Sequence, residues 1–165
     1  MKRSGADLGF LAAAILAAAA GCERVHGCTL IGCQDQASLS LRRADGAPPN
    51  LAVSLDLDGR MVDCAAPQGT AGAACDSGVQ VWSRELQACT EGMQGGARTL
   101  ICVPTGKFEQ VITVSGTPTV IRATARSADA VIEERTFEPQ YKTNRPNGPD
   151  CEPVCRQSSD IWTLP

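Results

Sequence analysis

The side chains in this sequence best suited to chemistry are its nine cysteines, several of which lie close together along the chain. Four residues separate Cys28 from Cys33, and three separate Cys151 from Cys155. Structural zinc sites use cysteine pairs of about this spacing, whereas cysteines in an oxidising compartment form disulfides instead. No two cysteines have the Cys-x-x-Cys spacing of thiol-disulfide oxidoreductases, so we do not expect that activity.

Histidine-dependent chemistry would require His26, the only histidine in the chain. It lies four residues after Cys22, in a segment that we expect to be a tether without fixed geometry. Neither histidine-assisted nucleophilic catalysis nor a histidine zinc site is therefore expected. We predict no catalytic residue, no metal site and no cofactor.

The segment 56–63 places three aspartates around Gly59 and so suggests a calcium loop. It lacks the terminal glutamate and the flanking helices of an EF-hand. The dipeptide Asp58-Gly59 is a preferred two-residue hairpin turn, and we interpret the segment in that way.

Three large aromatic residues, Trp82, Tyr141 and Trp162, would offer a stacking platform for a sugar or an anchor for a partner if they were exposed. Isolated aromatic residues are more often in the core or partly buried, and we expect the same here.

Residues 1–21 have the pattern of an export signal. Lys2 and Arg3 precede an alanine-rich apolar run that is too short to cross a membrane, which takes about 20 residues. The small residues directly before Cys22 resemble the lipobox of bacterial lipoproteins, although Ala19 stands where that pattern usually has leucine. We expect cleavage before Cys22, acylation of Cys22 and a lipidated tether over 22–27. Ordinary cleavage after Ala20 is the alternative.

The cysteine count supports acylation independently of the leader. Once Cys22 is used, an even number remains, as an exported disulfide framework requires. The disulfide cysteines are then Cys28, Cys33, Cys64, Cys75, Cys89, Cys102, Cys151 and Cys155.

Eight cysteines allow 105 pairings, so spacing alone does not fix the connectivity. We predict a Cys64–Cys102 bridge across the core and a Cys75–Cys89 bridge between two loops. Cys28 and Cys33 then pair with Cys151 and Cys155, which joins the start of the domain to its end. A local Cys28–Cys33 bridge is the alternative.

The charge balance argues against nucleic acid as a partner. The whole chain has a net charge of −3, and the leader removes two basic groups but only one acidic group, so the mature chain is more acidic still. No cluster of lysine or arginine reverses this locally, and such a surface repels phosphate backbones.

Residues 28–165 read as a single all-β domain, because short alternating segments rich in β-branched residues are separated by Gly, Pro, Asp and Asn. We predict an immunoglobulin-like sandwich of two sheets and seven to nine strands, with a closed barrel as the alternative. Expected strands are 37–42 at a sheet edge, the hairpin 51–57 with 60–64, and then 79–82, 98–103, 107–115, 119–126, 131–137 and 156–164. Residues 66–78 and 91–96 are expected to be loops. In the hairpin, Val53 should face Cys64 and Leu55 should face Val62, which turns Cys64 toward the core.

Two segments resemble a family of small exported bacterial lipoproteins without an established activity. In that family a Cys-Thr-x-x-Gly-Cys segment, here residues 28–33, precedes a β-domain that ends in Pro-Asn-Gly-Pro-x-Cys-x-Pro-x-Cys, here residues 146–155. The resemblance implies one exported β-domain and supplies no catalytic residue. Cys75 and Cys89 are additions particular to this chain.

The sequence therefore predicts a non-enzymatic lipoprotein of the bacterial cell envelope, held by an acyl anchor and serving in binding or structure. Glu23 is not the aspartate associated with inner-membrane retention, which favours the outer membrane. Partners expected are the membrane, through the anchor, and an envelope protein or glycan. A carboxylate-based hydrolase of the cell envelope and a protein that binds metal through its cysteine pairs are the alternatives.

Overall fold

The computed structural model describes residues 28–29, 31–68, 72–73, 75, 78–128 and 130–165. The leader, Cys22 and the tether with His26 lie outside this range. The described part contains strands and no helix. Its nine strands are β1 (Gln36–Arg43), β2 (Ala52–Leu57), β3 (Arg60–Cys64), β4 (Val79–Gln94), β5 (Ala97–Ser115), β6 (Ile121–Ser127), β7 (Ala130–Phe137), β8 (Lys142–Asn144) and β9 (Cys155–Leu164).

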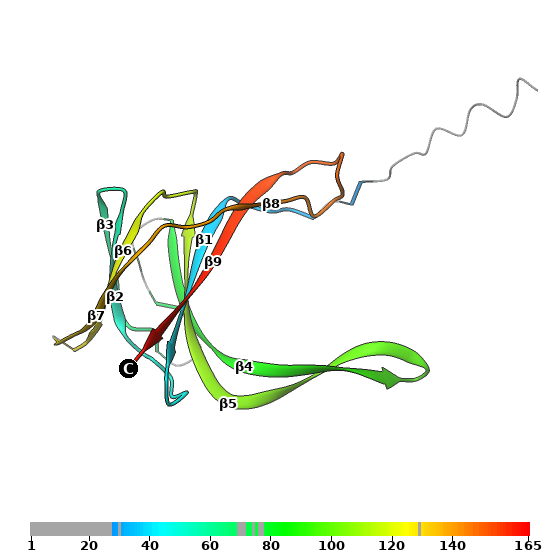
Figure 1. Cartoon of the computed structure of the whole chain (residues 1–165), viewed down its shortest axis with the longest axis horizontal. Helices are drawn as coiled ribbons and strands as arrows, with labels where there is room; N and C mark the ends of the chain where they lie inside the picture. Colours follow the sequence, from blue (N-terminus) through cyan, green and yellow to red (C-terminus); the bar gives the residue numbers. More distant parts are fainter. Residues whose placement is uncertain (1–27, 30, 69–71, 74, 76–77, 129) are drawn as a thin grey trace, which may run out of the picture.

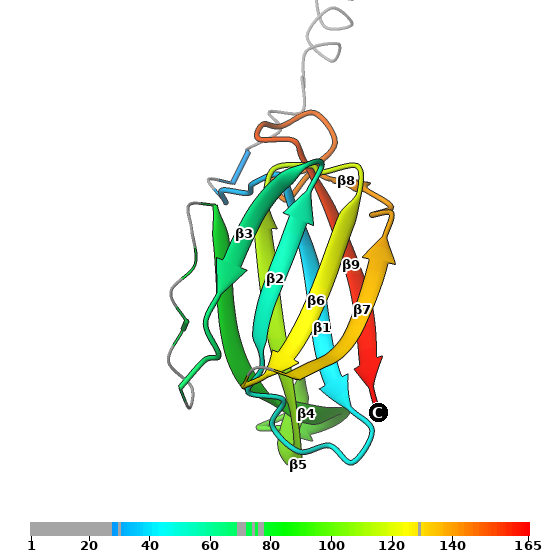
Figure 2. The same ribbon diagram turned by 90° about the vertical axis from the view of Figure 1, so that its left-hand side faces the viewer.

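The strands form two sheets that pack face to face, as the sequence predicts for an immunoglobulin-like sandwich (Figures 1 and 2). Sheet A has the order β4-β5-β1-β9-β8, and sheet B has the order β3-β2-β6-β7. All the pairings are antiparallel except that of β1 with β9, the first and last strands, which run parallel at the middle of sheet A.

The core lies between the sheets and is mainly aliphatic. Alternate residues of each inner face are buried, for example Leu39 and Leu41 of β1 and Leu55 of β2, all with no exposed surface. Trp162 of β9 is the largest fully buried side chain of the described part, and its ring makes an edge-to-face contact with that of Phe137, with 5.7 Å between the centroids. Such an edge-to-face pair adds to the stabilisation that burial of the two rings provides.

The strand predicted at 37–42 is correct, but its predicted position at a sheet edge is wrong. β1 lies between β5 and β9. The polar residues Ser38, Ser40 and Arg42 suggested an edge because alternation shows only that one face of a strand is polar. Here that polar face is part of the outer surface of sheet A.

The hairpin of β2 and β3 is confirmed in its register, with Val53 opposite Cys64 and Leu55 opposite Val62. Asp58 and Gly59 both have positive φ, 52° and 91°, as the predicted two-residue turn requires. The Asp58 carboxylate also accepts hydrogen bonds from the Thr119 hydroxyl and from the backbone N–H groups of Thr119 and Val120. These bonds lower the pKa of Asp58 and join the turn to the segment that leads into β6.

The long strands β4 and β5 depart most from the prediction. Their outer halves form a two-stranded hairpin, residues 87–104, that projects from the sandwich and that we call the arm (Figure 1). The predicted loop at 91–96 is wrong: the strands continue to a turn at Gly95 and Gly96, whose φ values of 60° and 84° suit glycine. A register shift between Glu85 and Gln87 marks the point where the arm leaves the sheet.

A buried glutamine links the two sheets. Gln110 of β5 has no exposed surface, and its side-chain amide pairs with the backbone of Leu51, which leads into β2. The Leu51 N–H donates to Gln110 Oε1 at 3.0 Å, and Gln110 Nε2 donates to the Leu51 carbonyl at 2.8 Å. The Gln110 amide thus pairs with the N–H and the carbonyl of Leu51, as a neighbouring strand would do for a buried backbone segment.

Replacing Gln110 with methionine should destabilise the fold, because it keeps most of the side-chain volume but leaves two buried groups of Leu51 unpaired. We expect a loss of about 2–4 kcal/mol in the free energy of unfolding, measured in urea under non-reducing conditions. Gln157→Met, on the outer face of sheet A, is the matched control and should change it little. Equal effects of the two substitutions would contradict this role for Gln110.

Candidate functional site

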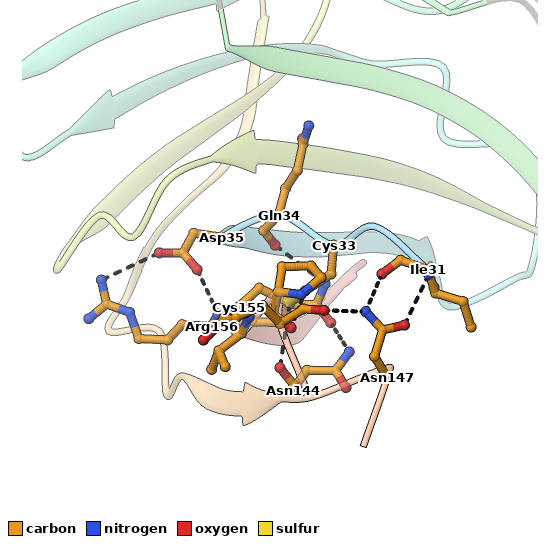
Figure 3. The surroundings of a disulfide bond; sticks show 12 residues. Ile31, Cys33, Gln34, Asp35, Asn144, Asn147, Cys155 and Arg156 are labelled. Atoms are coloured by element: carbon orange, nitrogen blue, oxygen red, sulfur yellow. Dashed lines mark hydrogen bonds and ion pairs between the residues drawn. A yellow bond between two sulfur atoms is a disulfide. The ribbon is translucent and has the colours of Figure 1, made fainter. Parts of the chain in front are cut away.

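The two motif segments meet at one end of the sandwich and form what we call the terminal clamp, residues 28–35 with residues 144–156. Cys28 bonds to Cys151 and Cys33 bonds to Cys155. The predicted joining of the start of the domain to its end is therefore confirmed, and the alternative Cys28–Cys33 bridge is wrong. Figure 3 shows this region around the second of these disulfides.

Asn147 is the centre of the polar contacts in the clamp. Its Oδ1 accepts hydrogen bonds from the Thr29 hydroxyl at 2.6 Å and from the Ile31 N–H at 2.9 Å. Its Nδ2 donates to the carbonyls of Ile31 and Glu152, at 3.0 and 2.6 Å (Figure 3). All four bonds involve a side chain that is itself buried. Thr29 of the first motif and Asn147 of the second therefore have a structural role, because they bond to each other and join the two segments.

The other two predicted bridges are wrong. Cys64 bonds to Cys75, and Cys89 bonds to Cys102. The predicted Cys64–Cys102 bridge assumed that Cys102 faces the core, but Cys102 is exposed on the arm. There it lies directly opposite Cys89 in the antiparallel ladder, with 4.0 Å between the Cα atoms.

With these four disulfides, all eight cysteines of the described range are oxidised. A metal site built on the cysteine pairs needs thiolates, which the disulfides do not supply. Among the described residues, no group of three or more His, Cys, Asp or Glu side chains is placed to hold a metal ion.

An open trough of about 700 Å³ lies on the outer face of sheet A. It extends across the sheet from β4 at one edge to β8 at the other. In Figure 1 this face lies between the arm and the end of the molecule that carries β8. The trough is lined by Gln36, Ser38, Ser40, Trp82, Arg84, Val111, Thr113, Gln140, Lys142, Thr143, Asn144, Gln157, Ser158 and Ser159.

Strand register arranges the outer face of sheet A, which includes the floor of the trough, in rows that cross the strands; Gln80, Ser115 and Ile161 of these rows lie outside the lining. One row is Trp82, Val111, Ser40 and Ile161, which are successive partners on β4, β5, β1 and β9.

The next row toward the clamp consists of the equivalent partners Gln80, Thr113, Ser38 and Ser159. A third row contains Ser115, Gln36, Gln157 and Lys142. An apolar stripe is thus followed on one side by hydroxyl and amide groups.

On the other side of the apolar stripe, Glu109 is held between two arginines. Arg42 and Arg84 each approach a different oxygen of its carboxylate, at 2.8 and 2.6 Å. Burial by itself would raise the pKa of Glu109, but the hydrogen bonds and charges of the two guanidinium groups more than offset it and lower the pKa. Glu109 is therefore ionised at neutral pH, and the group of three carries one net positive charge.

The three large aromatic residues are not brought together. Trp162 is in the core, as expected, and Tyr141 is half-buried, with its hydroxyl donating to the Pro118 carbonyl at 2.9 Å. Trp82 is half-buried and lines the trough. The sequence did not separate these roles. The alternation of Val79, Val81 and Ser83 with Gln80 and Trp82 was the available signal that Trp82 lies on the outer face.

Comparisons with protein-family models, with curated proteins and with solved structures find no match to this chain. In the described part, no helix has the length and apolar character needed to cross a membrane.

Replacing Asn147 with alanine should loosen the clamp, because it removes four hydrogen bonds between segments distant in the chain. We expect faster hydrogen exchange in residues 28–35, measured by mass spectrometry with the disulfides intact during labelling. Asn144→Ala is the matched control, since the Asn144 side chain is exposed and donates a hydrogen bond to Gln157, which lies outside residues 28–35. Unchanged exchange in the Asn147 variant would show that the disulfides alone hold the segment.

Proposed function

We propose that this protein is a non-enzymatic lipoprotein of the bacterial cell envelope, anchored by acyl chains on Cys22, which binds an envelope protein through the arm. The observation that carries the proposal is the arm itself, a disulfide-bonded hairpin with exposed apolar side chains that extends beyond the sandwich. The leader pattern and the four disulfides support export.

The arm presents large apolar side chains to solvent on both of its faces. Met93, Leu100, Ile101 and Val103 are 66, 62, 47 and 54% exposed. Ile101 and Val103 lie on one face of the ladder, and Leu100 and Met93 lie on the other with the Cys89–Cys102 bridge. Exposed apolar groups gathered in one projecting element favour contact with another protein.

The Cys89–Cys102 disulfide stabilises the arm although its apolar side chains are exposed. A two-stranded hairpin alone is marginally stable in water, and beyond residue 87 the arm pairs with no third strand among the residues that the structure describes. The Cys89–Cys102 bridge joins the two strands near the base of the arm, at the third of its paired positions. A rigid arm loses little conformational entropy on binding, which favours affinity.

The position of the arm indicates which way it faces. Cys28 lies at the clamp end of the sandwich, and the six residues from Cys22 to Cys28 extend over at most about 21 Å. The arm leaves the sandwich at the opposite end (Figures 1 and 2). An acyl anchor at Cys22 would therefore keep the clamp close to the membrane and hold the arm away from the surface.

The hydrolase alternative gains no support from the trough. A glycosidase of the usual kind needs two carboxyl groups, one of them protonated to act as general acid. The described lining contains no carboxylate, and Glu109, which pairs with the lining residue Arg84, is kept ionised by its two arginines. We therefore retain the binding function.

The anchor is tested by the intact mass of the unreduced protein from the membrane fraction after alkylation. We expect a chain that begins at an acylated Cys22, carries no alkyl group and has lost two hydrogens for each of four disulfides. A mass that corresponds to cleavage after Ala20, or an alkylated cysteine, would overturn this part of the proposal.

The arm is tested by placing a photo-crosslinking amino acid at position 100 in cells. We expect a discrete adduct with one envelope protein, lost when Met93, on the same face of the arm, is also changed to Asp. Position 61 on β3 is the matched control, because Met61 and Leu100 are both 62% exposed. No adduct from position 100, or the same adducts from both positions, would overturn the assignment of the arm as the binding element.

A further inference from the structure

We propose that the trough on the outer face of sheet A is a second binding site, which accepts a hydroxyl-rich glycan chain bearing carboxylates. This inference concerns a different surface from the arm and holds whether or not the arm binds a protein. It rests on the shape of the trough, the chemistry of its rows and the charges at its two sides.

The shape suits an extended chain. The lining residues come from all five strands of sheet A, so the trough runs across the sheet. Five strands at about 4.8 Å spacing give a path of about 20 Å, which is several sugar rings long and more than one small ligand needs. The trough is open to solvent along this path, so a polymer can lie in it without threading.

The floor suits the two kinds of surface that a sugar ring offers. The row that starts at Trp82 supplies the half-buried aromatic ring of Trp82 in the lining and, just beyond the lining, the side chain of Ile161, which is 52% exposed. Aromatic and aliphatic side chains of this kind pack against apolar C–H faces. The adjoining rows supply hydroxyl groups from Ser38 and Ser159 and amides from Gln36, Gln157 and others. Hydroxyl and amide groups both donate and accept hydrogen bonds, as sugar hydroxyls do.

The charges add a preference for acidic glycans. Arg84 is 60% exposed in its side chain although it pairs with Glu109, so one face of its guanidinium remains open to a ligand. Lys142 is exposed at the opposite edge of the trough. A positive trough on a chain whose net charge is −3 attracts an anionic partner to this face in particular.

The same charges argue against a densely charged polyanion. The lining holds two cationic side chains, Arg84 and Lys142, among many neutral hydroxyl and amide groups. A nucleic acid or polyphosphate needs a cation for most of its phosphates, and these side chains do not supply them. Carboxylates spaced along a hydroxylated chain match this pattern better.

The binding test uses tryptophan fluorescence, because the chain has two tryptophans with opposite environments. Trp162 is fully buried, and Trp82 lines the trough, so a change in emission on binding reports Trp82. We expect oligomers of alginate, a polyuronate, to change the emission with saturation. Neutral dextran should bind more weakly, and polyglutamate, which is acidic but has no sugar ring, should bind least.

Variants locate the site by equilibrium dialysis with labelled alginate. Trp82→Ala should weaken binding about tenfold, and Lys142→Gln should weaken it less and reduce its salt dependence. Arg126→Ala is the matched control, because Arg126 is an exposed arginine on sheet B, and it should bind as the wild type does. Leu100→Asp on the arm should also leave alginate binding unchanged, so a failure of the arm proposal is distinguishable from a failure of this one.

Three outcomes would overturn the proposal: no binding of any glycan to the folded protein, equal binding of polyglutamate and alginate, or alginate binding that Trp82→Ala leaves unchanged. Sedimentation with purified peptidoglycan sacculi is the second arm of the experiment, since that polymer also combines sugar rings with carboxylates. Binding to sacculi but not to alginate would support the proposed class of ligand, an acidic glycan, and would identify peptidoglycan as its source.

Discussion

The joining of the two ends of the chain is the constraint on which the rest of the structure depends. Cys28 and Cys33 bond to Cys151 and Cys155, with sequence separations of 123 and 122 residues, and β1 pairs in parallel with β9 at the middle of sheet A. A bridge that closes a loop of this length removes about 4–5 kcal/mol of chain entropy from the unfolded state in the usual model. The second bridge closes nearly the same loop, so the two do not add.

The second bridge has a different role from the first. With Cys28 and Cys151 already joined, the additional loop that includes Cys33 and Cys155 is short, so its entropic contribution is small. What it adds is orientation: the two segments are fixed at two points, and the four hydrogen bonds of Asn147 become possible between them. The clamp is thus rigid near the proposed anchor.

Sheet A connects the clamp to the surfaces that we assign to binding. Its strands carry the core on one face and the trough on the other, and two of them continue past the sandwich to form the arm. Ionised Glu109 between Arg42 and Arg84 lies near the point where the arm begins. Hydrogen bonds between charged groups have a preferred geometry, so they orient these three side chains at that border of the trough.

Some of this organisation follows from local sequence alone. Alternation of apolar and polar residues determines strands, because side chains of a strand point alternately to its two faces. The Asp58-Gly59 turn determines the register of its hairpin, and Cys64 is turned inward for that reason. The even number of cysteines beyond Cys22 agrees with the disulfides found, and the grouping of the two end pairs is confirmed.

Features that depend on which strands are neighbours were decided only by the tertiary structure. The pattern of β1 shows a polar face, yet whether that face borders an edge or a trough depends on β5 and β9, which come much later in the chain. Cys102 alternates as a core residue would, but it lies on the arm, where it is exposed and neither of the two described sheets covers it, and so it pairs with Cys89. Alternation of apolar and polar residues shows that the two faces of a strand differ, but it does not show what packs against either face. The trough, the arm and two of the four disulfides were therefore determined by the assembly of the sheets.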